Sequence, residues 1–77
     1  MSDGKNLLMA AVGDFESVLP FQAVGVSPFT PENGLRELLL GLAKEHYAVV
    51  FLVDSLYRDN QEMVEELNEN YAMSIIP

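Results

Sequence analysis

The chain has 77 residues, with 12 acidic against 4 basic side chains for a net charge of −8, and it contains no cysteine. A chain this short forms one domain at most, so residues 1–77 are treated as a single domain. The lack of cysteine excludes a disulfide framework and a thiolate metal site, and the acidic balance disfavours nucleic acid as a partner. No apolar run approaches the ~20 residues of a membrane span, and we therefore expect a cytoplasmic protein without direct membrane insertion.

Four short segments are predicted to form β-strands. Residues 7–12 and 47–53 are apolar runs without alternation, which is typical of strands that are covered on both faces. Residues 72–76 form a weaker run of the same kind. The segment 25–29 contains Pro28, and because proline removes a ladder donor, this strand is expected at a sheet edge.

A short helix is expected between the first two strands, with Asp14 as its candidate N-cap. Pro20 restricts the helix to a start near Glu16 or Ser17, since proline is tolerated only within the first turn. Gly25 suits the left-handed position that follows the helix end near Val24.

Two longer helices follow. Thr30 is the candidate N-cap of the first, with Pro31 as its first helical residue, and its apolar positions recur with helical spacing. The second is predicted over residues 55–70, with Asp54 as its candidate cap. The apolar stripes of the two helices are Leu35, Leu38, Leu39, Leu42 and Ala43 in the first, and Leu56, Met63, Val64 and Leu67 in the second.

Alternation of strands and helices predicts an α/β fold with a parallel sheet. The expected architecture is a four-stranded parallel sheet flanked by helices. It has the receiver-like, truncated doubly wound order β-α-β-α-β-α-β, with right-handed crossovers.

Asp14 and Asp54 end the first and third strands, at the sheet edge where α/β proteins bind ligands. One interpretation is a receiver-like phosphoacceptor site, with Asp54 phosphorylated and Asp14 holding Mg²⁺. Phe15 stands where a second acid is usual, and a fifth strand with its lysine is missing. Nucleotide binding is a weaker alternative, since no glycine-rich phosphate motif is present. The simplest interpretation is that both carboxylates cap helices, and no cofactor, metal or catalytic residue is predicted.

Other polar residues suggest little chemistry. His46 is expected at a solvated helix end, and the acids between Glu62 and Glu69 form either a solvated helix face or a surface for a basic partner. Edge strands and off-stripe apolar residues are candidate contacts for a partner or for a second copy of the chain. The candidate interface residues are Phe29, Leu40, Ile75 and Ile76.

The ordered motifs resemble the F subunit of the V-type and A-type rotary ATPases. Family members carry Gly-Asp-x-Asp-Thr/Ser-Val-x-x-Phe and then Gly-Val. The corresponding stretches of this chain are "GDFESVLPF" and "GV". Two positions differ, since Glu16 replaces the usual aspartate and Pro20 replaces a common glycine. "LAKEHYAVVFLVDSL" and "SIIP" resemble two further family motifs. The likeness covers nearly the whole chain in order and spacing.

This resemblance implies a non-catalytic component of the central stalk. Such a protein binds the coiled-coil D subunit of the rotor and other stalk subunits, lies peripheral to the membrane, and helps to couple ATP turnover to ion transport. Family members continue past the last strand into a C-terminal helix, whose rotor contacts correspond to no residue up to Pro77. The receiver-like signalling domain and an unrelated α/β interaction domain remain the alternatives.

Overall fold

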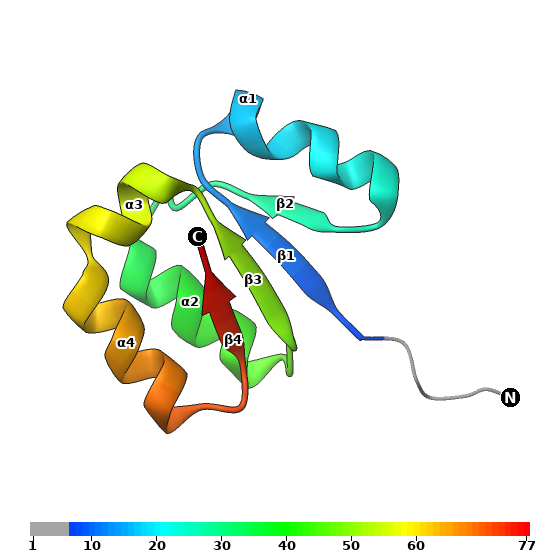
Figure 1. The fold of residues 1–77 in the computed structure, drawn as a ribbon. Coiled ribbons are helices and arrows are strands. Elements are labelled where there is room, and N and C mark those ends of the chain that lie inside the picture. The colour runs from blue at the N-terminus through cyan, green and yellow to red at the C-terminus, as the bar shows by residue number, and fades with distance from the viewer. Residues whose placement is uncertain (1–6) are drawn as a thin grey trace, which may run out of the picture.

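The computed structural model describes residues 7–77 and has a parallel four-stranded sheet with strand order β2-β1-β3-β4 (Figure 1). This confirms the predicted fold class, and it confirms that the strand containing Pro28 lies at an edge. The strands are β1 (Met9–Val12), β2 (Ser27–Phe29), β3 (Val49–Leu52) and β4 (Ser74–Ile76). The helices are α1 (Phe15–Val18), the 3-10 helix η1 (Leu19–Val24), α2 (Leu35–Lys44), α3 (Asp54–Asp59) and α4 (Gln61–Asn70).

The two faces of the sheet are covered unequally. Right-handed crossovers place a helix on one face when the chain moves from β1 to β2, and on the other face when it moves back towards β3 and β4. Consequently α2, α3 and α4 pack on what we call the first face, whereas, of the elements within residues 7–77, only α1 and η1 pack on the second face (Figure 1).

The main core lies between the first face and its helices. Because strand side chains alternate between faces, Ala10 and Val12 of β1 point into this core, while Ala11 points to the second face. The fully buried side chains of the main core include Val12, Leu39, Val50, Leu52, Val64, Leu67 and Ile75.

The link from β1 to β2 is not the single predicted helix starting near Glu16 or Ser17, because α1 begins at Phe15 and the 3-10 helix η1 follows it from Leu19 to Val24. Pro20 lies in the first turn of η1, where its missing N–H leaves no hydrogen bond unmade. The helix ends at Gly25, whose φ of 83° is the left-handed conformation that glycine adopts without strain.

The predicted start of α2 at Pro31, with Thr30 as N-cap, is wrong. The helix begins at Leu35, after Gly34, and no side chain caps it. Gly34 has a φ of 112°, which is outside the helical region, so the chain from Thr30 to Gly34 forms a non-helical bend. The first hydrogen bond of the helix joins the Leu38 N–H to the Gly34 carbonyl at 3.2 Å.

The predicted helix over residues 55–70 is in fact two helices. Asn60 separates α3 from α4 with φ −130° and ψ 30°, outside the helical region. Its side-chain amide donates to the Leu56 carbonyl at 3.0 Å, and its own carbonyl accepts the Val64 N–H at 2.9 Å. Asparagine thus ends one helix and starts the next, because its side chain replaces backbone hydrogen bonds that the break removes.

Helix α2 ends in a Schellman motif. The Tyr47 N–H donates to the Leu42 carbonyl at 3.1 Å and the His46 N–H to the Ala43 carbonyl at 3.1 Å, which is the 6→1 and 5→2 pair of this motif. His46 occupies the left-handed position with a φ of 67°, where glycine is usual. His46 is therefore an exposed residue at a helix end, and its main structural feature is a strained backbone.

Candidate functional site

Asp14 and Asp54 lie at the carboxyl ends of the adjacent strands β1 and β3. Between these ends is a shallow cavity of about 270 Å³, lined by Gly13, Asp14, Thr30, Pro31, Val53, Ser55 and Leu56. This is the place where an α/β sheet binds small ligands, so the two carboxylates are the first candidates for a chemical site.

The Asp14 carboxylate is turned towards its own helix. One of its oxygens, Oδ2, accepts the Ser17 hydroxyl at 2.9 Å and the Ser17 backbone N–H at 3.2 Å, which makes Asp14 the N-cap of α1. These two hydrogen bonds, the hydroxyl first, stabilise the charged form and lower the pKa of Asp14 below its ordinary value of 3.8. A carboxylate held in this way is a helix cap and a poor proton acceptor at neutral pH.

Asp54 does not cap α3, which corrects the prediction made for it. The N-cap is Val53, without a side-chain hydrogen bond, and Asp54 is the first helical residue. Its carboxylate Oδ2 lies 3.2 Å from Arg58 Nε, one helical turn away, in a solvent-exposed ion pair. Asp54 still favours the helix, since a negative charge in the first turn complements the helix dipole.

Nothing in the described chain gathers metal-ligating side chains. Within residues 7–77 no group of three or more His, Asp or Glu side chains is placed to hold a metal ion. Asp14 and Asp54 each make their polar contact within one turn of their own helix, rather than with each other. The arrangement is that of two separate helix starts, and it offers no assembled acid, base or Mg²⁺ cradle.

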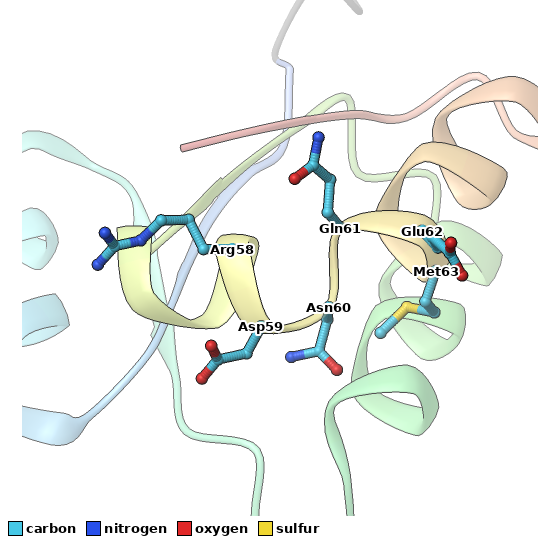
Figure 2. A pocket seen from close by; sticks show the side chains of 6 residues that line it. All are labelled: Arg58, Asp59, Asn60, Gln61, Glu62 and Met63. Atoms are coloured by element: carbon cyan, nitrogen blue, oxygen red, sulfur yellow. The ribbon is translucent and has the colours of Figure 1, made fainter.

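A second surface cavity, of about 380 Å³, lies at the break between α3 and α4. It is lined by the consecutive residues Arg58, Asp59, Asn60, Gln61, Glu62 and Met63. Figure 2 shows the Gln61 side chain on one side of the ribbon and the Asp59 and Asn60 side chains on the other, with Arg58 extending away from all three. A bound molecule would meet no convergent set of polar groups there.

An apolar surface is exposed on the second face instead. Phe51 of β3 is partly covered by Phe21, whose ring stacks on it with centroids 5.8 Å apart. Next to Phe51 in the ladder lies Ile76, which is 39% exposed, and half-buried Val49 follows on the same face. We call Val49, Phe51, Ser74 and Ile76 the open sheet half, because α1 and η1 pack mainly on the part of this face that β1 and β2 form and reach β3 at Phe51.

The four predicted interface residues occupy different surroundings. Ile76 lies in the open sheet half, whereas Ile75 is 2% exposed and belongs to the main core. Phe29 and Leu40 are half-buried against that core from the other edge, and the Phe29 ring meets Tyr47 edge-on at 6.0 Å. The fold therefore does not bring these four side chains into one patch.

The class of protein follows from these observations: a truncated receiver-like α/β domain with an apolar surface on one sheet face. The family model of the ATP synthase (F/14-kDa) subunit matches residues 9–77, and the chain belongs to this family. Curated relatives include the V-type ATP synthase F subunit of Fusobacterium nucleatum, which is 30% identical over 88% of this chain and 67% of the relative.

Two clostridial relatives give the same result. The V-type ATP synthase F subunit of Clostridium botulinum strain Eklund 17B is 31% identical over 88% of this chain and 68% of its own length. The corresponding protein of Clostridium perfringens is 31% identical over 90% of this chain and 64% of its own length. The chain thus spans about two thirds of the length of these relatives. No solved structure gave a significant match.

Sequence reasoning missed the open sheet half. The apolar run over residues 47–53 predicted a strand that is covered on both faces, whereas Phe51 is only half-buried. The available signal was the number of crossovers: with four strands, a single helical segment is left for the second face.

Within residues 7–77, no helix is both long and apolar enough to span a bilayer.

Proposed function

We propose that the chain is a non-catalytic component of the central stalk of a V/A-type rotary ATPase. In this role it binds the coiled-coil D subunit of the rotor and other stalk subunits, on the cytoplasmic side and peripheral to the membrane. It thereby helps to couple ATP turnover to ion transport. The observation that carries the proposal is the family match over residues 9–77.

The geometry supports a binding role through the open sheet half. Ile76 of β4 is 39% exposed there, and Val49 and Phe51 of β3 beside it are half-buried. Exposed apolar surface on a small domain commonly marks a protein contact. A helix of a coiled coil can lay an apolar stripe on such a surface. Of the residues predicted from sequence, Ile76 is the proposed direct contact, with Phe29 and Leu40 as further candidates and Ile75 supporting the surface from the core.

The test is native mass spectrometry of this chain mixed with the rotor coiled coil, the D subunit from the same organism, followed by titration calorimetry. We expect a 1:1 complex, and we expect Ile76→Glu to weaken it roughly tenfold or more, because a charge would be buried at the contact. Val24→Glu is the matched control, since Val24 is 72% exposed and lies at the end of η1.

The possible results separate the role from the surface. Failure to bind the rotor coiled coil in both measurements, by this chain and by a version extended with the family's C-terminal helix, would refute the stalk assignment. Binding by the extended version alone would keep the assignment and reject the open sheet half as a sufficient contact. Binding that Ile76→Glu and Val24→Glu weaken equally would keep the assignment and reject the open sheet half as the contact. Phe29→Ala and Leu40→Ala would then test the other side of the domain.

A further inference from the structure

The open sheet has two edges, at β2 and β4. Edge strands usually present unpaired backbone N–H and C=O groups, which can add a strand from a second copy of the chain or from a partner. Whether either edge can accept another strand depends on the hydrogen-bonding groups that face outward from it.

At the β4 edge the outward groups are already occupied. The Ser74 N–H donates to the Ala48 carbonyl at 2.9 Å, so Ser74 faces β3. The next residue, Ile75, turns its backbone the other way, and its N–H donates to Asn68 Oδ1 at 2.8 Å. Asn68 Nδ2 in turn donates to the Ile75 carbonyl at 3.1 Å. One side-chain amide thus takes both hydrogen bonds that a fifth strand would need at the middle of this three-residue strand.

The position of Asn68 is fixed by the packing of α4. Val64 and Leu67 on the same helix are 0% and 2% exposed and are buried in the main core. These two anchors hold the helix against the sheet, and the half-buried Asn68 is thereby placed beside the β4 backbone.

At the β2 edge a different residue removes the outward donor. The Phe29 carbonyl accepts the Gly13 N–H at 3.1 Å, so Phe29 faces β1. Its neighbour Pro28 therefore has the outward position, and proline has no N–H to offer to another strand.

We propose that Asn68 and Pro28 close the two sheet edges against strand addition, with the Asn68 amide as the occupant of the β4 edge. The chain accordingly associates neither with itself nor with a partner strand through the sheet edges, and partners meet its side-chain surfaces. This argues against the edge strands as contacts for a second copy of the chain, which the sequence had left open. The closure is independent of whether the rotor coiled coil is the partner.

The test compares Asn68→Leu with Asn70→Leu, which adds the same apolar side chain to an exposed site on the same helix. In the unmodified chain we expect the outward Ile75 amide to be protected from hydrogen exchange and the protein to sediment as a monomer. In Asn68→Leu the Ile75 amide should exchange roughly tenfold faster, since its acceptor is gone, and the protein should self-associate with rising concentration. Asn70→Leu should do neither.

Three results would overturn the proposal. The first is an Ile75 amide in the unmodified chain that exchanges like an exposed amide. The second is an Asn68→Leu protein that is folded and stays as monomeric as Asn70→Leu. If Asn68→Leu does not fold, Asn68→Ser replaces it, because serine is too short to bridge both backbone groups of Ile75. The third result is then an Asn68→Ser protein that stays monomeric and keeps the Ile75 amide equally protected.

Discussion

The Val53 side chain packs directly against the Cα of Gly13, so closely that a methyl group on Gly13 would overlap both Val53 γ-carbons. The contact joins the end of β1 to the end of β3, where the Val53 N–H also donates to the Val12 carbonyl at 3.0 Å. The Gly-Asp pair after the first strand thus has two structural tasks. Glycine admits the neighbouring strand, and Asp14 starts the next helix.

Gly13→Ala should destabilise the fold by about 1–3 kcal/mol, because overpacking at a buried site forces shifts of backbone or side chains. Urea unfolding followed by circular dichroism measures the change. Gly41→Ala is the matched control of opposite sign, since Gly41 is exposed within α2 and a methyl group there meets nothing within 4 Å. It should stabilise the fold by about 0.5–1 kcal/mol through helix propensity. Equal effects of the two substitutions would contradict the close packing at Gly13.

His46→Gly should stabilise the protein by up to about 1 kcal/mol, because glycine adopts the left-handed φ of 67° at the end of α2 without steric cost. His46→Ala is the control: it removes the imidazole and keeps the strained backbone, so it should give no gain. Thermal unfolding of the three proteins measures the difference. A stabilising His46→Ala would show that the imidazole, and not the backbone, is unfavourable at this position.

Asp14 should make stability depend on pH in the acid range. The folded-state pKa lies below the unfolded value near 3.8, so the folded state prefers the ionised carboxylate. The stabilising contribution is therefore complete above about pH 3.8 and is lost as the pH falls through the lower folded-state pKa. An NMR titration of the Asp14 carboxyl carbon should show the low pKa directly.

Ser17→Ala tests the cause of the lowered pKa, because it deletes the hydroxyl donor and leaves the backbone N–H in place. The pKa of Asp14 should move back towards 3.8 in this variant.

Asp14→Ala tests the stability effect of the cap. In urea unfolding, the stability difference between the unmodified chain and Asp14→Ala should shrink at the acid end of the range. A difference of constant size down to about pH 2.5 would contradict the assignment of Asp14 as a charged cap.

Asp54 should fail as a phosphoacceptor. Its carboxylate pairs with Arg58, and Asp14 is bound to Ser17, so neither is free to build a Mg²⁺ site without losing its present partner. Addition of beryllofluoride with Mg²⁺ should leave the amide NMR signals of Asp54 and Ser55 unchanged. A saturable shift that Asp54→Asn abolishes would instead establish the receiver-like alternative, and Asp59→Asn on the same helix is the control.

The sequence by itself was sufficient for most of the fold. Apolar runs without alternation located the strands, helical spacing located α2 and α4, and Pro28 placed β2 at an edge. These features are local: each depends on the period of the side chains or on the chemistry of one residue. The ordered motifs were likewise sufficient to indicate the family to which the chain belongs.

Helix boundaries were less predictable, because competing local signals had to be weighed. Thr30-Pro31 is a typical helix start, yet α2 begins only after Gly34. The apolar stripe from Leu56 to Leu67 predicted one long helix and gave no sign of the break at Asn60. In each place a residue with a non-helical backbone ends or delays the helix, and the surrounding packing decides which signal prevails.

Only the tertiary structure decided what the surfaces can do. Asp14 and Asp54 are at adjacent strand ends, as the topology requires, but the side-chain rotamers turn each carboxylate to its own helix. Asn68 is one of several polar residues on α4, and its contact with Ile75 depends on how that helix lies against β4. Side-chain periodicity fixes which face a residue occupies, whereas hydrogen bonds between residues on different elements depend on the relative placement of those elements, which no local pattern contains.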